Sequence, residues 1–246
     1  MTSLVLKEGD IAKAQERYKG DKSIMFFSQG RIPRGESYAR NIGIENSLGK
    51  YIAFVDHDCV VKEDWIEKIL FSFHDVESDK KVVCLLGNHW LYQSYTIWLK
   101  LYGKYREDHA REHFSNENNL VFTNRLDGRN FALIKEVVKD FQFREDLMTE
   151  QDRELGVNLT KNGYKILFNE AMIVYHEPIT LRQIIKRQYH YGLGSAIWRK
   201  TPNWFNRFYL FHFKRFLARE IGYSQLIFTM FCNFLYQLGR LSAKFR

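Results

Sequence analysis

The chain has 246 residues, of which 45% are hydrophobic and 27% charged, so it can bury a large core, and this composition excludes an intrinsically disordered protein. Its three cysteines, Cys59, Cys84 and Cys232, are odd in number and far apart. With no signal peptide expected, they argue against a disulfide framework and favour a reducing compartment.

The formal net charge of +8 is unevenly distributed. Residues 179–246 hold twelve Lys or Arg and a single acid, Glu220, whereas residues 1–178 hold 25 Lys or Arg and 28 Asp or Glu. This asymmetry predicts that the C-terminal part contacts an anionic partner, such as a membrane, a lipid-linked phosphate or nucleic acid.

The first elements are expected to be short. We predict strands at residues 2–6 and 23–27 with a polar helix at residues 11–18 between them. A polar loop at residues 28–35 then leads into a helix over residues 36–47, which has one apolar side and ends before Gly49.

The most informative stretch is a five-residue apolar run, Tyr51 to Val55, followed at once by Asp56 and Asp58. The run predicts a buried strand in a parallel or mixed sheet, and ligands of such sheets gather beyond the carboxyl ends of the strands. Two carboxylates that emerge there together imply a divalent cation or a shared proton. An acidic turn without a ligand is the alternative.

The later elements alternate between helical and strand patterns. For the helix predicted at residues 149–162, Thr149 is the expected N-cap and Asn162-Gly163 the expected end. The carboxylate of Asp152 could have no role beyond satisfying this cap. The predicted helices span residues 63–73, 90–111 and 149–162; the predicted strands span residues 82–86, 131–134, 164–168 and 172–175; a loop is expected at residues 116–119.

Five short motifs, in this order, resemble inverting family 2 glycosyltransferases of the GT-A fold. They cover roughly residues 25–195. The motifs are Gly35-Glu-Ser-Tyr-Ala-Arg40-Asn-Ile-Gly-Ile, Gly49-Lys-Tyr-Ile-Ala-Phe-Val-Asp56-His-Asp58, Asp127-Gly-Arg-Asn-Phe-Ala-Leu-Ile134, Gln151-Asp152-Arg-Glu-Leu-Gly with its continuation to Ile166, and Val174-Tyr-His176 with Arg187-Gln-Tyr-His-Tyr-Gly-Leu-Gly194.

The resemblance implies an α/β fold with a GT-A-like mixed, mostly parallel sheet flanked by helices. It also implies transfer of a sugar from a nucleotide-sugar donor to an acceptor hydroxyl, with Mg²⁺ or Mn²⁺ neutralising the diphosphate that leaves. By the same resemblance, Gly35, Arg40, Asp56 and Asp58 would bind the nucleotide sugar. Asp56, Asp58 and His176 would form the metal site, although a lone His is more often structural.

Inversion requires a general base that takes the proton of the acceptor hydroxyl. The resemblance assigns this role to Asp152, with Glu150 as the second choice, and Gln151 stands where the family usually has Glu. A further departure is the N-terminus: family members begin with an apolar strand that this chain is expected to lack, and the loss of that strand would put nucleotide binding in doubt.

We predict a transferase domain at residues 1–195 and a basic aromatic helical tail at residues 196–246. Residues 221–239 carry no charge, but Ser224, Gln225, Asn233 and Gln237 make them a poor bilayer span of about 20 residues. A tail lying in the membrane interface fits better and predicts an enzyme of cell envelope polysaccharide synthesis, peripheral at the cytoplasmic face of a membrane, with a glycan or lipid-linked acceptor. The alternative is a tail packed on the enzyme or on a second subunit, and no nucleic acid is expected.

Two other functions fit some of the residues. The run Asp56-His-Asp58-Cys-Val60 also suits a haloacid dehalogenase-like phosphatase with Asp56 as the nucleophile. A truncated, non-catalytic paralogue that binds a membrane or a partner through its tail is the other possibility.

Overall fold

The computed structural model describes residues 16–17, 19–20, 34–91, 96–176, 179–198 and 222–243. The predicted strands at residues 2–6 and 23–27 lie outside these residues. The chain forms two compact units: a first of Met1–Trp90 with His113–His176, and a second of Leu91–Glu112 with Glu177–Arg246. The second unit therefore includes more of the chain than the tail predicted from residue 196.

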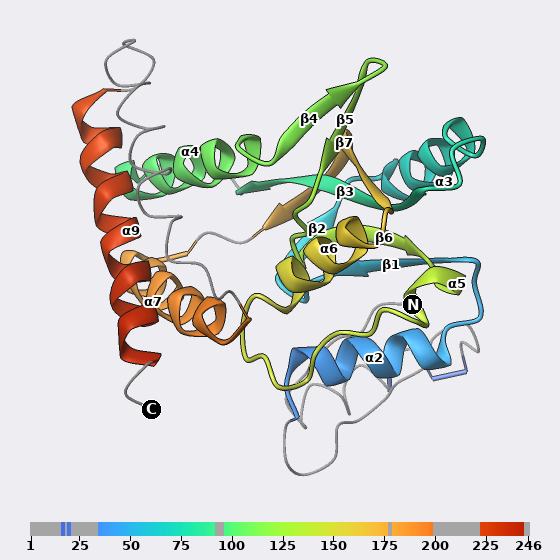
Figure 1. Ribbon diagram of the computed structural model, residues 1–246, viewed down its shortest axis with the longest axis horizontal. Coiled ribbons are helices and arrows are strands. Elements are labelled where there is room, and N and C mark those ends of the chain that lie inside the picture. The colour runs from blue at the N-terminus through green and yellow to red at the C-terminus, as the bar shows by residue number, and fades with distance from the viewer. Residues whose placement is uncertain are drawn as a thin grey trace. The chain divides into compact units, whose positions relative to one another are not determined.

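The first unit is built on one seven-stranded sheet (Figure 1). Its strand order is β1-β6-β3-β7-β5-β4, and β2 pairs with β7. The strands are β1 (Tyr51–Val55), β2 (Cys59–Val61), β3 (Val82–Leu91), β4 (Phe114–Glu117), β5 (Leu120–Thr123), β6 (Asn130–Ile134) and β7 (Lys165–His176).

The predicted α/β architecture is confirmed, but the expected mostly parallel pairing is wrong for the described part of the chain. Five strand pairs have a defined register there, and all five are antiparallel. The reason is the position of β6, which pairs antiparallel with both β1 and β3. These two strands therefore run in the same direction but are separated by β6.

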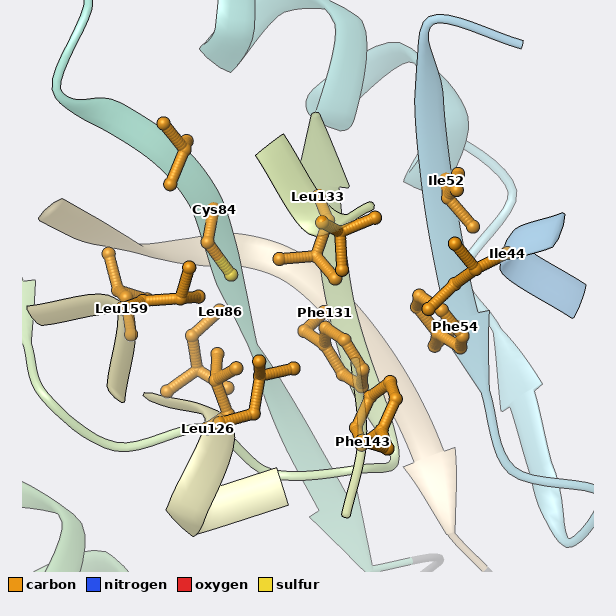
Figure 2. Packing of buried hydrophobic residues seen from close by; sticks show 14 residues of the cluster. Ile44, Ile52, Phe54, Cys84, Leu86, Leu126, Phe131, Leu133, Phe143 and Leu159 are labelled. Carbon is orange, nitrogen blue, oxygen red and sulfur yellow. The ribbon is translucent and has the colours of Figure 1, made fainter. Parts of the chain in front are cut away.

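Helices cover both faces of this sheet. Successive side chains of β1 point alternately to the two faces and so enter two different core clusters. Ile52 and Phe54 point into one core cluster, whereas Tyr51, Ala53 and Val55 pack against another. The first cluster, seen in Figure 2, contains residues of α2 (Glu36–Asn46), α5 (Lys135–Val138) and α6 (Gln151–Lys161). The second contains the apolar face of α3 (Trp65–Asp75).

Several predicted boundaries change in the structure. The expected loop at residues 116–119 is the tip of the β4–β5 hairpin, where Asn118 and Asn119 have φ of 50° and 63°. Asparagine tolerates this left-handed backbone, which closes a two-residue hairpin. The two strands predicted between residues 164 and 175 are one strand, β7, and the helix predicted from residue 90 begins only at Ile97, because β3 continues to Leu91.

The second unit is helical and consists, in its described part, of α4 (Ile97–Arg111), α7 (Leu181–Trp198) and α9 (Tyr223–Ser242). Its core joins Leu99, Tyr102 and Tyr105 of α4 to Ile184 of α7 and to α9. None of the helices among the described residues is long and apolar enough to cross a membrane.

Candidate functional site

The end of β1 holds a partly buried ion pair. Asp56 is the first residue after the strand, and its Oδ1 lies 3.2 Å from Nη2 of Arg40, which α2 contributes and which is only 6% exposed. Burial raises the pKa of Asp56 to about 6, and the Arg40 charge opposes this increase. The predicted ligand residues Arg40 and Asp56 therefore contact each other directly.

Arg40 has a second acidic neighbour and one nitrogen without a partner. Its Nη2 lies 3.3 Å from Oε2 of Glu36, one helical turn earlier on α2. Nη1 is buried, and it has no hydrogen-bond partner among the residues that the structure describes. A buried guanidinium N–H without an acceptor is unfavourable, so this nitrogen can take an oxygen atom of a bound ligand.

Gly35, the other predicted nucleotide-binding residue of this segment, is the N-cap of α2. It has φ of 93°, a conformation that a side chain would strain, and an added Cβ would meet no atom within 4 Å. The glycine therefore serves the backbone geometry at the start of the helix that carries Arg40.

Asp58 belongs to a different cluster from Asp56. Its Oδ2 lies 3.2 Å from Nε2 of His176, and Cys59 pairs directly with His176 where β2 meets β7. One ligand atom from each of Asp58, Cys59 and His176 lies within 4.8 Å of the others. Two remote segments thus converge on one small set of possible metal ligands.

The chemistry of this set fits Mn²⁺ or Mg²⁺ through two of its three members. A carboxylate and an imidazole are suitable ligands for such ions. The third, the Cys59 thiol, has its pKa raised to about 12, first by burial and then by the neighbouring Asp58 and Asp56. Without a cation the thiol is therefore protonated at neutral pH. Sulfur is also a soft ligand, which Mg²⁺ and Mn²⁺ do not favour, so Asp58 and His176 are the donors that fit.

Asp152 lies in the first turn of α6, whose N-cap is Glu150, one residue after the predicted Thr149. Its Oδ2 accepts a 2.7 Å hydrogen bond from the backbone N–H of Gly128, and its Oδ1 accepts one of 2.9 Å from the N–H of Arg153. Glu150 is buried, has a left-handed backbone and forms an ion pair with Arg153. Of the two candidate bases, Asp152 is therefore the more exposed, whereas Glu150 is paired with the guanidinium of Arg153.

Gly128 connects the Arg40 pair to Asp152. A Cβ at Gly128 would lie 2.6 Å from Nη2 of Arg40, so the bare backbone passes against the guanidinium while its N–H binds Asp152. A second connection runs through Glu36, whose Oε2 accepts a 2.8 Å hydrogen bond from Nε2 of Gln151. The structure thus brings Arg40, Asp56 and Asp152 into one contact network.

Sequence reasoning gave no role to Glu36 or Gly128. Gly128 lies within the quoted Asp127-Gly128-Arg129-Asn130 motif, which could have drawn attention to it, whereas nothing in the pattern of residues 36–46 distinguishes Glu36. Gln151, noted only as a departure from the family, is the partner of Glu36. Its neutral amide can donate a hydrogen bond to that carboxylate, which a glutamate could not do when ionised.

Known proteins similar to this chain are glycosyltransferases. The family model for Glycosyl transferase family 2 matches residues 9–131. Glycosyltransferase AglE of Haloferax volcanii is 25% identical over 169 residues, which are 67% of this chain and 52% of that protein. The uncharacterized glycosyltransferase MJ1057 of Methanocaldococcus jannaschii is 25% identical over 241 residues, 92% of this chain and 78% of that protein.

Among solved structures, the mannosyltransferase PcManGT from Pyrobaculum calidifontis, in complex with GDP-Man and Mn²⁺, superposes with a TM-score of 0.57. It is 14% identical, and the match covers 80% of this chain and 54% of that one. This likeness defines the class of fold, which is the GT-A fold of glycosyltransferases. The sequence matches go further: the chain belongs to glycosyl transferase family 2.

This membership favours the transferase over the phosphatase alternative for Asp56. The chain nevertheless spans only about half the length of AglE and of PcManGT.

Proposed function

We propose that this chain is a metal-dependent inverting glycosyltransferase that moves a sugar from a nucleotide-sugar donor to an acceptor hydroxyl. The observation that carries the proposal is the contact network from Asp56 through Arg40 and Gly128 to Asp152. It joins the carboxylate that follows β1 to a carboxylate at the start of a remote helix, within one compact unit. A donor-side group and a base must lie this close to act on one bound sugar.

On the donor side, Arg40 and Asp56 would bind the nucleotide. The unpaired Nη1 of Arg40 would donate to an oxygen of the ligand, and Asp56 would accept from a ribose hydroxyl or join the metal site. Gly35 would shape the start of α2 beside them. The fixed pair of Arg40 with Asp56 holds both groups in place before the donor arrives.

Asp58 and His176 would hold a divalent cation, with Asp56 as a further predicted ligand. When bound, Mg²⁺ or Mn²⁺ would neutralise negative charge on the departing diphosphate. PcManGT, of the same fold, was solved with Mn²⁺ and GDP-Man, which supports a metal and a nucleotide sugar here. His176 is 2% exposed and faces Asp58, so its position is defined without a ligand.

Asp152 would act as the general base. Its carboxylate takes the proton of the acceptor hydroxyl as that oxygen forms a bond to the anomeric carbon, and the bond from this carbon to the diphosphate oxygen breaks with its electron pair. Attack from the opposite face inverts the anomeric centre. The N–H groups of Gly128 and Arg153 fix the orientation of the carboxylate.

For the acceptor, we propose a glycan or a lipid-linked carrier at an anionic membrane. The support is the composition of residues 198–219, where aromatic and basic side chains are interleaved. This would place the enzyme at the cytoplasmic face of a membrane.

The test compares Asp58→Ala and Asp152→Asn with the wild type. Donor and Mn²⁺ binding would be measured by calorimetry and by Mn²⁺ electron paramagnetic resonance, and turnover by donor hydrolysis and sugar transfer. We expect Asp58→Ala to lose metal-dependent donor binding, and His176→Gln to weaken Mn²⁺ binding by about tenfold. Asp152→Asn should keep donor and Mn²⁺ binding but lose at least about 100-fold in turnover.

Asp75→Ala and Asp140→Asn are matched controls, because both aspartates are exposed and lie outside this network. They should leave binding and turnover unchanged. Wild-type transfer rates in both Asp58→Ala and Asp152→Asn would refute the assignments. Absence of transfer by the wild type with every nucleotide sugar would favour the non-catalytic alternative.

A further inference from the structure

The outer face of α9 is almost entirely apolar. Every exposed position of this helix except Ser224 carries a large apolar or aromatic side chain. We call this surface the α9 stripe; it consists of Tyr223, Ile227, Met230, Phe231, Phe234, Leu238 and Leu241.

The spacing of these residues places them on one continuous surface. At 100° per residue they fall within an arc of about 100°, and at 1.5 Å per residue they extend for about 27 Å along the helix. No charged residue occurs in α9 before Arg240. The stripe is therefore long, narrow and uncharged, which is unusual for a surface that faces water.

The buried face of the same helix is polar in part. Gln225, Thr229 and Asn233 follow one another at four-residue intervals and are all buried. Gln225 donates a 3.3 Å hydrogen bond to the carbonyl of Leu101 on α4. Both polar atoms of the Asn233 side chain lack a hydrogen-bond partner among the described residues.

The contact between α9 and α7 also follows the pattern of helices that pack in lipid. A Cβ added at Gly239 would lie 2.0 Å from the carbonyl oxygen of Tyr189, and one added at Gly192 would lie 2.0 Å from that of Tyr236. Nη1 of Arg240 donates a 3.1 Å hydrogen bond to Oγ of buried Ser195 across this contact. Small residues and polar bonds inside, with apolar residues outside, are favourable where the surroundings are hydrocarbon.

The sequence that leads into α9 is complementary to an anionic surface. Residues 199–220 contain six Lys or Arg and one acid, together with seven aromatic residues. Such a combination favours the headgroup region of an anionic bilayer, where cations meet lipid phosphates and aromatic rings lie at the interface.

We propose that the α9 stripe inserts into the interface of an anionic membrane, with the helix axis parallel to the surface. The exposed apolar residues of α9 lie on one face, and its other face packs in the core with residues of α4 and α7. This arrangement fits a helix that lies on a bilayer. The inference rests on the membrane partner proposed above and assigns that contact to seven residues. It does not depend on which sugar is transferred.

The test measures how much of the full chain sediments with lipid vesicles. One set of vesicles is pure phosphatidylcholine, and the other also contains about 30% of the anionic lipid phosphatidylglycerol. Ile227→Glu/Phe234→Glu changes two stripe residues that are 65% and 60% exposed. The matched control is Ile66→Glu/Phe71→Glu on α3, where the side chains are 63% and 68% exposed. Circular dichroism would show that both variants remain folded, as expected for exposed positions.

We expect the wild type and the α3 variant to bind the anionic vesicles equally and the stripe variant to bind at least about tenfold more weakly. Equal binding by all three proteins, or no binding by the wild type, would overturn the inference. The inference would also be overturned if the wild type bound no vesicles and light scattering showed that it is a dimer while the stripe variant is a monomer. Because donor and acceptor are omitted, normal vesicle binding by a chain without transferase activity would count against the proposed reaction and would support the stripe.

Discussion

The backbone N–H of Gly128 donates a 2.7 Å hydrogen bond to the carboxylate of Asp152, while the absent side chain of Gly128 leaves room for Arg40. One residue thus sets the distance between the donor-side ion pair and the proposed base. We therefore expect that a very small increase in the volume of residue 128 will affect catalysis without unfolding the protein.

Gly128→Ala should weaken donor binding by about tenfold or more, because its Cβ would lie 2.6 Å from Nη2 of Arg40 and would displace the guanidinium from Asp56. Calorimetric titration with the nucleotide sugar would measure this. Gly222→Ala is the control, since no atom lies within 4 Å of a Cβ at that position and its φ is −83°. Equal donor affinity in the two variants would show that Gly128 does not position Arg40.

Asn130→Ala should destabilise the first unit by about 3 kcal/mol, because the buried Asn130 side chain makes three hydrogen bonds that would be lost. The Asn130 carbonyl accepts from Nε1 of Trp65, and its amide donates to the carbonyls of Asn88 and Met172. Urea unfolding followed by fluorescence would give the change in free energy. The control Asn162→Ala removes an exposed amide and should cost less than about 1 kcal/mol; a similar cost for both would contradict the assignment.

Gly239→Ala should separate α7 from α9, because its Cβ would lie 2.0 Å from the backbone carbonyl oxygen of Tyr189, which cannot rotate away. We expect a loss of at least about 3 kcal/mol in the stability of the helical unit and faster proteolysis of the C-terminal part. Limited proteolysis with mass spectrometry would detect this. An unchanged cleavage pattern would show that the two helices do not pack as closely as described.

The Cys232 thiol should react slowly with Ellman's reagent in the native protein. Burial raises its pKa to about 12, and the thiolate is the reactive form, so at pH 8 its reactive fraction is roughly 1,000-fold below that of an ordinary thiol. The rate should increase about tenfold per pH unit as the pH rises toward 12 while the fold persists. Urea-unfolded protein is the control and should react rapidly; rapid native labelling of Cys232 at pH 8 would contradict its burial.

Local sequence patterns determined much of the fold and the types of residues at the site. The apolar run from Tyr51 to Val55 predicted β1 to the residue, because a buried strand needs little beyond five apolar side chains and an abrupt polar end. The stop at Asn162-Gly163 was also predicted correctly, since Gly163 has the left-handed φ of 84° that favours glycine. Asp56, Asp58 and Asp152 stood out because their motifs are short and continuous in the chain.

Only the tertiary structure decided which of these residues meet. No pattern in the sequence reveals that β6 separates β1 from β3, because strand order depends on contacts between segments about 50 to 80 residues apart. The contact of Gly128 with both Arg40 and Asp152, and the pairing of Glu36 with Gln151, depend on that packing in the same way. Likewise, the sequence showed that residues 221–239 are uncharged, but only the burial of each side chain separated an apolar outer face of α9 from a partly polar inner one.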